Sequence, residues 1–97
     1  MSEVIEAAVE AMQAKFPDGI DGAGKCVLRG EGAVMVDAEG VRADDEDAEA
    51  DVTLAAEVEV FRAILEGRLS PTVAFMSGRL SVRGDMGLAM RLSSMMG

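Results

Sequence analysis

Four short extended runs separated by glycine turns occupy the middle of the chain, and this pattern limits the fold more than any other feature. The runs are predicted at Lys25–Glu31, Ala33–Asp37, Val41–Asp44 and Ala50–Ala55. Gly30 and Gly32 frame the first turn and Gly40 ends the second, so the first three runs are expected to form an antiparallel meander. In the fourth, Val52 and Leu54 alternate with polar residues, as in a strand with one buried face.

Segments with helical spacing flank these strands. Apolar residues from Val4 to Phe16 predict an amphipathic first helix, with Ser2 as its N-cap and Pro17 as its stop. Further helices are predicted over residues 57–65, 71–76 and 85–96, the second of them capped by Ser70, and a fifth strand over Arg79–Arg83. Because the first four strands follow one another directly, the predicted fold class is α+β rather than alternating α/β.

Length and composition favour one soluble domain. Ninety-seven residues can build a single core, so one domain over residues 1–97 is expected. No apolar run approaches the length of a membrane span, and the N-terminal segment lacks the pattern of a secretory signal. The single cysteine, Cys26, can form no internal disulfide, which fits a reducing compartment. A cytoplasmic location is expected.

The charge is distributed unevenly. Residues 1–61 hold sixteen acids and four bases, a balance of −12, whereas residues 62–97 hold five arginines against Glu66 and Asp85, a balance of +3. An acidic chain without a basic block is not expected to bind nucleic acid. The arginines are either ordinary solvated surface or a patch that meets an anionic headgroup, a coenzyme A phosphate or a membrane surface.

The residue inventory does not favour catalysis. The chain has no His and no Tyr, and Cys26 has no imidazole to activate it, so the protein is not expected to be an enzyme. The acidic run from Asp44 to Asp51 lacks the spacing and mid-loop glycine of an EF-hand, so it is interpreted as a solvated loop. No metal site and no cofactor are expected. The glycines between Gly22 and Gly32 lack phosphate-loop spacing.

The segment from Gly67 to Met96 holds five of the eight methionines. Thioether side chains are flexible and polarizable, so they adapt to irregular apolar shapes, which suggests a pocket for a greasy ligand. The last predicted helix is apolar around more than half of its circumference. That width leaves open whether the helix makes extra core contacts or presents a functional surface.

Several motifs in this half carry a resemblance to a known family. They are Asp51-Val52-Thr53-Leu54, Gly67-Arg68-Leu69-Ser70-Pro71, Ala74-Phe75-Met76 and the run Gly78–Leu92, GRLSVRGDMGLAMRL. Together they resemble the sterol carrier protein type 2 domain over nearly the whole chain. The resemblance implies a five-stranded, mostly antiparallel sheet covered on one face by helices, with a hydrophobic tunnel between the layers. It also implies binding, without chemical change, of fatty acids, fatty acyl-CoA, phospholipids or sterols.

The family pattern assigns tunnel positions to ten apolar residues, each of which also suits an ordinary core. They are Phe61, Leu65, Phe75, Met76, Leu80, Val82, Met86, Leu88, Met90 and Met95. A polar headgroup is expected to meet one or more of four arginines. These are Arg68, Arg79, Arg83 and Arg91.

Two functions from different classes remain open. The first is a non-catalytic lipid-binding or lipid-transfer protein, for which the short elements favour acyl chains over sterols. The alternative is a small accessory or scaffold protein that docks through its apolar C-terminal helix on a lipid-pathway enzyme or on itself. The sequence ends without the signal that sends eukaryotic family members to peroxisomes, so a bacterial cytoplasmic protein, monomeric or weakly dimeric, is expected.

Overall fold

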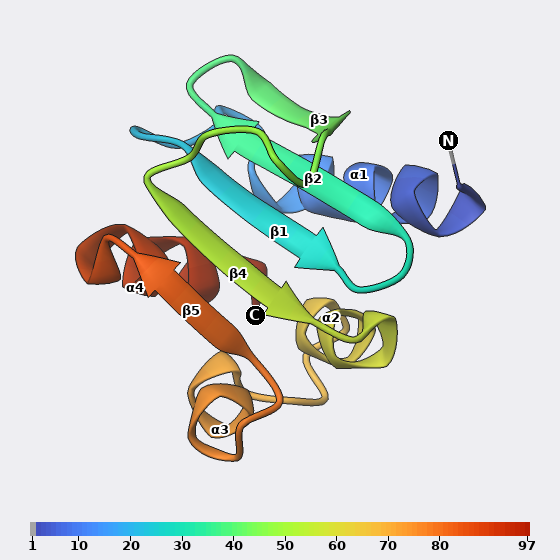
Figure 1. Ribbon diagram of the computed structural model, residues 1–97, viewed down its shortest axis with the longest axis vertical. Helices are drawn as coiled ribbons and strands as arrows, with labels where there is room; N and C mark the ends of the chain where they lie inside the picture. The colour runs from blue at the N-terminus through green and yellow to red at the C-terminus, as the bar shows by residue number, and fades with distance from the viewer. Residues whose placement is uncertain (1) are drawn as a thin grey trace.

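The computed structural model describes residues 2–97 and contains four helices and five strands in these residues (Figure 1). In chain order they are α1 (Glu3–Lys15), β1 (Gly24–Leu28), β2 (Gly32–Asp37), β3 (Gly40–Asp44), β4 (Val52–Ala56), α2 (Val58–Leu65), α3 (Pro71–Met76), β5 (Ser81–Gly84) and α4 (Met86–Met96). The order of elements agrees with the sequence prediction and confirms the α+β class. No helix in this part of the chain has the length and apolar character needed to cross a bilayer.

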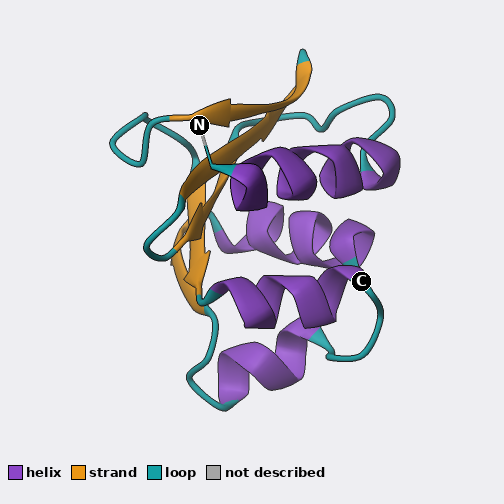
Figure 2. Cartoon of the chain, turned by 90° about the vertical axis from the view of Figure 1, so that its right-hand side faces the viewer, coloured by secondary structure: helices purple, strands orange, loops and turns teal. Residues whose placement is uncertain are grey.

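The five strands form one sheet in the order β3-β2-β1-β4-β5. The first three make the predicted antiparallel meander, and β4 and β5 are also antiparallel. The central pair is parallel: Cys26 on β1 lies opposite Leu54 on β4. The sheet is therefore mixed and mostly antiparallel. Figure 2 shows the helices gathered on one face of it.

The core lies between that face and the helices. Helix α1 packs over β2 and β3, whereas α4 packs over β1, β4 and β5. Phe16, Phe61 and Leu92 are among the large side chains fully buried there. Burial of such side chains contributes roughly 1.5–3 kcal/mol each, which supplies most of the stability of a domain of this size.

Helix ends follow local rules, with one difference from prediction. The Ser2 hydroxyl accepts a hydrogen bond from the Ile5 amide at 3.0 Å, as expected of an N-cap. Asp85 caps α4 in the same way through the Leu88 amide at 3.0 Å. Ser70 occupies the N-cap position of α3, but its side chain makes no capping bond. Pro71 at the first helical turn leaves one amide fewer to satisfy there.

Three strands are shorter than predicted, because backbone groups near their ends bond elsewhere. β1 ends at Leu28, whose carbonyl accepts from the Glu31 amide in the turn. β5 begins at Ser81 rather than Arg79, because the amides of Arg79 and Leu80 donate to the Ala74 carbonyl and finish α3. β4 begins at Val52 rather than Ala50.

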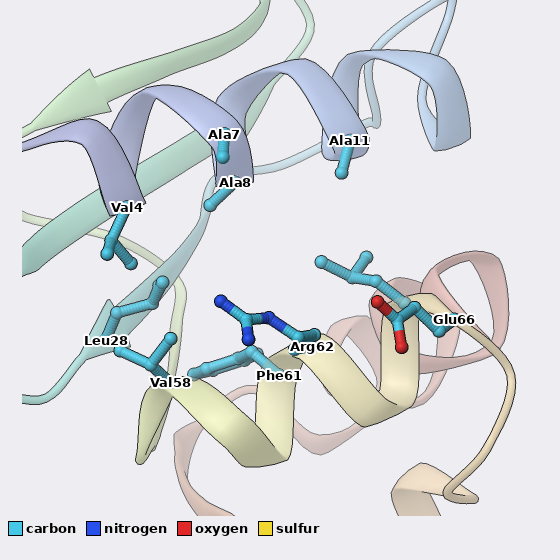
Figure 3. A pocket seen from close by; sticks show the side chains of 10 residues that line it. Val4, Ala7, Ala8, Ala11, Leu28, Val58, Phe61, Arg62 and Glu66 are labelled. Atoms are coloured by element: carbon cyan, nitrogen blue, oxygen red, sulfur yellow. The ribbon is translucent and has the colours of Figure 1, made fainter.

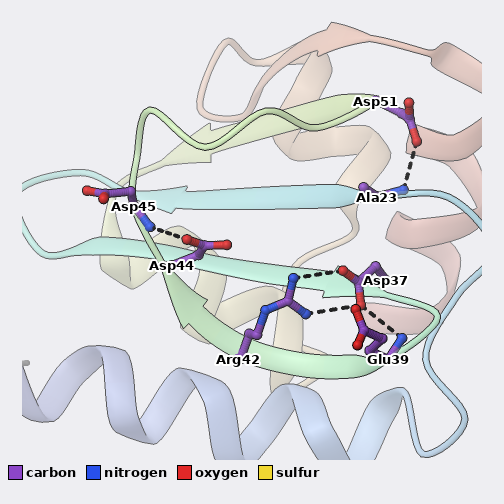
Figure 4. Close-up of polar contacts among 7 residues, drawn as sticks. All are labelled: Ala23, Asp37, Glu39, Arg42, Asp44, Asp45 and Asp51. Carbon is purple, nitrogen blue, oxygen red and sulfur yellow. Dashed lines mark hydrogen bonds and ion pairs between the residues drawn. The ribbon is translucent and has the colours of Figure 1, made fainter.

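The segment between β3 and β4 crosses the face of the sheet opposite the helices (Figure 4). Lys25, only 7% exposed, donates its ammonium to the carbonyls of Glu46 and Ala48 in this segment, the latter at 2.8 Å. Asp51 accepts from the Ala23 amide at 2.8 Å. The carboxylates of the acidic run are exposed, so the segment binds the sheet mainly through its backbone.

Candidate ligand-binding site

Two apolar grooves open in the helical layer, and they share no lining residue. The α1–α2 groove has a volume of about 240 Å³ (Figure 3). Its lining residues are Val4, Ala7, Ala8, Ala11, Leu28, Val58, Phe61, Arg62, Leu65 and Glu66. The α3–α4 groove has a volume of about 390 Å³. Its lining residues are Pro71, Thr72, Phe75, Leu80, Val82, Met86, Ala89, Met90, Ser93 and Ser94.

The α3–α4 groove brings together half of the predicted tunnel residues. These are Phe75, Leu80, Val82, Met86 and Met90. They meet because α3, β5 and α4 follow one another, with only short connections between them. Leu80 and Ala89 are buried in this groove, whereas Phe75, Met86 and Met90 are exposed. The groove therefore combines a buried aliphatic floor with a rim of large, exposed side chains.

Polar groups in the α3–α4 groove are few and uncharged. Thr72, Ser93 and Ser94 contribute hydroxyls, and the Ser94 hydroxyl donates to the Arg91 carbonyl at 3.0 Å. A hydroxyl without a neighbouring base is a weak nucleophile but a good hydrogen-bond partner for a polar headgroup. The arrangement suits an amphiphile that is held rather than transformed.

The α1–α2 groove is built differently. Alanines at positions 7, 8 and 11 leave space on the α1 side, and Phe61 lies on the α2 side (Figure 3). Leu65, also on α2, lines the same groove. Arg62 and Glu66 provide its charges. Arg62 Nη1 lies 3.2 Å from Glu59 Oε1, and Glu66 Oε1 lies 2.6 Å from Arg68 Nη2. Both charges of the groove therefore already have partners on the protein.

The remaining predicted tunnel residues are divided. Phe61 and Leu65 line the α1–α2 groove. Leu88 is a core residue, whereas Met76 and Met95 are exposed, and these three line neither groove. The structure thus distributes the ten positions between two grooves, the core and the surface. A single tunnel joining them stays a prediction, as does the binding role of each residue.

The four candidate headgroup arginines line neither groove. Arg68 is bound to Glu66 through its Nε at 2.8 Å. Arg79, Arg83 and Arg91 are exposed and form no ion pair with any carboxylate in residues 2–97. Arg79 follows α3 and Arg91 lies on α4 next to Met90. Their headgroup role therefore also stays a prediction.

Sequence reasoning missed the α1 wall, and it counted Arg62 among the five C-terminal arginines without assigning it to a groove. The signal for the wall was the row of small residues at positions 7, 8 and 11, which share one side of a helix. The signal for Arg62 was its place one turn before Glu66 on a helix whose opposite side is apolar. Both signals acquire meaning only when α1 and α2 are known to be neighbours.

The titratable groups with shifted pKa values in residues 2–97, which include Cys26 and Asp37, lie outside the grooves. Burial raises the pKa of the Cys26 thiol to about 12, which keeps it neutral inside the sheet. Hydrogen bonds from Arg42 hold the pKa of Asp37 below its usual value at the β2–β3 turn (Figure 4). Arg42 donates to both Asp37 oxygens, at 3.0 and 2.8 Å.

Comparisons with known proteins place this fold in a known context. The curated relative "Hydroxysteroid dehydrogenase-like protein 2" of Danio rerio is 51% identical over 47 residues, which are 48% of this chain and 11% of that protein. The chain therefore spans only a small part of that relative's length. The match lies within a much larger protein.

Solved structures agree with the fold. The crystal structure of sterol carrier protein 2 like 2 from Aedes aegypti superposes with a TM-score of 0.75 at 24% identity, covering 94% of each chain. A solution structure of the palmitated Aedes aegypti protein gives a TM-score of 0.66 at 24% identity, covering 99% of this chain and 95% of that one. Residues 20–97 match the profile of the SCP-2 sterol transfer family. The chain belongs to this family.

Proposed function

We propose that this protein binds and transfers a lipid without changing it chemically, and that the α3–α4 groove is where the ligand enters. The observation that carries the proposal is the composition of that groove: a buried aliphatic floor, a rim of Phe75, Met86 and Met90, and no charged side chain among its lining residues. Membership of a sterol transfer family supports the general role.

An acyl chain is the ligand that the groove favours. Ligand pockets have volumes of roughly 300–1,000 Å³, so the groove at about 390 Å³ stands at the small end of that range. A linear chain can enter such a space part by part, whereas a rigid sterol nucleus needs its full width at once. The palmitated Aedes aegypti relative supports the same preference.

The expected affinity follows from burial of methylenes. Each buried methylene contributes about 0.8 kcal/mol, and association costs on the order of 4–15 kcal/mol. Micromolar affinity, about 8 kcal/mol, therefore requires burial of about 15 methylenes even at the smallest association cost, so a long chain has to be almost fully enclosed. Fatty acids, fatty acyl-CoA and phospholipids all offer such a chain, and the groove hydroxyls or the nearby Arg79 and Arg91 would meet the headgroup.

The ligand is best identified by mass spectrometry of the freshly purified protein, under native conditions and again after solvent extraction. We expect a stoichiometric adduct that is lost on denaturation and recovered in the organic phase with the mass of a fatty acyl lipid. An apo mass that also stays unchanged after addition of fatty acids, acyl-CoA and sterols would contradict the proposal. In that case the groove would be closed by its own methionines.

A further inference from the structure

One polar or charged side chain is buried in residues 2–97, that of Lys25 on β1. Lys25 and Met35 are cross-strand partners, so their side chains share the face of the sheet opposite the helices. Met35 is also buried, and the lysine ammonium donates to the carbonyls of Glu46 and Ala48. Residues 45–51, here called the strap, are therefore packed against the sheet at this point. The strap carries five carboxylates and no basic residue.

The Lys25 ammonium fastens the middle of the strap. An ammonium that leaves water is destabilised unless hydrogen bonds replace its solvation, and hydrogen bonds from a charged donor are stronger than those from a neutral one. An apolar residue at position 25 would leave two strap carbonyls facing a side chain that cannot donate. Lys25 lines neither groove, so any role of this lysine in ligand binding is indirect.

The last residue of the strap, Asp51, is bonded to two other segments of the chain. Its amide donates to the Ala23 carbonyl at 2.8 Å, and its carboxylate accepts from the Ala23 amide at 2.8 Å (Figure 4). The Asp51 carbonyl accepts from the Asp85 amide at 2.9 Å. A Cβ at Gly84 would overlap the same carbonyl oxygen, so the two segments approach closely. Asp51 therefore joins the strap to the loop before β1 and to the N-cap of α4.

From this N-cap the contacts continue into the first turn of α4. The Asp85 carboxylate accepts from the Leu88 amide at 3.0 Å. A Cβ at Gly22 would lie 3.0 Å from Leu88 Cδ2 and 3.4 Å from Asp51 Oδ2, so the helix turn and the carboxylate border the same small space. Met86, in the same turn, lines the α3–α4 groove. Direct contacts thus lead from the strap on one face of the sheet to the groove on the other.

We propose that Lys25, the strap and Asp51 position the first turn of α4 from the far side of the sheet. Asp51 is the positioning residue, and Lys25 acts through it by holding the strap in place. When the strap is detached, the bond from the Asp85 amide weakens, the turn that carries Met86 becomes mobile, and a ligand leaves the α3–α4 groove faster. Only this last consequence rests on the proposed function; the coupling between strap and helix does not.

The coupling is local, because the core holds the rest of α4. Leu92 and Met96 in the later turns are buried, so their packing fixes those turns independently of the strap. Detaching the strap is therefore expected to affect the start of α4 and to spare α1. A defect that only lowered the stability of the whole domain would instead accelerate hydrogen exchange by a common factor at all amides that exchange through global unfolding.

The test is hydrogen–deuterium exchange of the full chain, compared between the start of α4 and the middle of α1. Asp51→Ala removes the carboxylate that accepts from the Ala23 amide. Loss of one hydrogen bond corresponds to a change of about two- to tenfold in an opening equilibrium, so exchange of the Asp85 and Leu88 amides should rise by that factor. Exchange of the Met12 amide in α1 should stay unchanged. Asp51→Asn keeps an acceptor oxygen and should restore nearly native exchange.

Asp47→Ala is the matched control, because it removes an exposed carboxylate from the same strap and changes the net charge by the same amount. It should leave exchange at the start of α4 unchanged. Lys25→Met should reproduce the effect of Asp51→Ala, since methionine donates no hydrogen bond to the strap. Unchanged exchange at the start of α4 in Asp51→Ala, or an equal rise at Met12, would overturn the proposal. Urea titration checks that each variant folds, and the Asp51 and Asp47 variants decide if Lys25→Met does not.

Stopped-flow release of a fluorescent fatty acid separates this coupling from the proposed function. Release from Asp51→Ala should be about two- to tenfold faster than from the native chain or from Asp47→Ala. A native chain that takes up no fatty acid but shows the expected exchange pattern would contradict the proposed function and leave the coupling intact. Fatty acid uptake without that exchange pattern would overturn the coupling alone. Equal release rates in folded variants that do show the pattern would overturn the link between the helix turn and ligand release.

Discussion

The two grooves of the helical layer are both apolar, yet they differ in what forms their walls. Small alanines and the buried Phe61 bound the α1–α2 groove, and its two charges are paired with neighbours. Exposed methionines and a phenylalanine bound the α3–α4 groove, and unpaired arginines lie near it. Apolar lining alone therefore does not identify a ligand site. The exposure of the wall side chains, and the nearby arginines that have no ion pair in residues 2–97, separate the two.

The strongest test of this difference replaces one phenylalanine in each groove. Phe61 is 2% exposed and Phe75 is 47% exposed, so only the first is a core residue. Phe61→Ala should lower the free energy of unfolding by about 3–5 kcal/mol because it leaves a cavity. Phe75→Ala should lower it by about 1 kcal/mol or less. Urea titration followed by circular dichroism measures both, and equal losses would remove the distinction.

A second test compares two glycines with positive φ. Gly40 ends the β2–β3 turn with φ 121° and has open space where a Cβ would lie. Gly84 ends β5 with φ 110°, and its Cβ would overlap the Asp51 carbonyl oxygen. Both alanine variants are strained, but Gly84→Ala should lose about 1–3 kcal/mol more because of the overlap.

Gly84→Ala also bears on the groove, since β5 supplies part of its wall. It should reduce fatty acid uptake, measured by displacement of a fluorescent fatty acid, whereas Gly40→Ala should not. Equal uptake by both folded variants would show that the position of β5 has no influence on the site.

A third test places a carboxylate on the rim of the α3–α4 groove. Met90→Glu should weaken fatty acid uptake by about tenfold or more, because a charge would have to lose its water when the chain enters. Far-UV circular dichroism should stay nearly native, since Met90 is exposed. Val73→Glu is the control on the same surface outside the groove. Unchanged uptake by Met90→Glu would contradict the assignment of the groove.

The smallest expected effect concerns the paired charges of the acidic region. Arg42 lowers the pKa of Asp37, so the ionised carboxylate is favoured in the folded state and stabilises it above the usual Asp pKa. That contribution is lost as the pH falls below about 4 and through the lowered folded value. Asp37→Asn should slightly reduce stability at neutral pH and flatten this part of the acid profile. An unchanged profile would show that the exposed pair contributes nothing measurable.

The sequence predicted the elements well because each is encoded locally, as the alternation around Val52 and Leu54 in β4 illustrates. The parallel pairing of β1 with β4 was not predicted, since it depends on a connection that crosses the sheet and on the burial of Lys25 beneath it. The predicted strand ends were wrong where backbone groups form hydrogen bonds within turns, as the Arg79 amide does with the Ala74 carbonyl.

The candidate site was likewise predictable only where its residues belong to neighbouring elements of the chain. Phe75, Leu80 and Met86 come together in one groove because they belong to elements that follow one another. Phe61 and Leu65 lie in the other groove because α2 faces α1, which no local pattern indicates. For the same reason the alanines of α1 were missed and Arg62 was not assigned to a groove.

Cys26, wholly buried on β1 between β2 and β4, gives the molecule an internal reporter of its own opening. It is the single thiol of the chain, and a water-soluble disulfide reagent can reach it only when the helices and the sheet separate. The rate of labelling therefore counts those separations. A lipid that enters between the helices and the sheet requires the same separations, so its entry is tied to the labelling rate. A lipid that stays in the outer groove leaves the labelling rate unaltered.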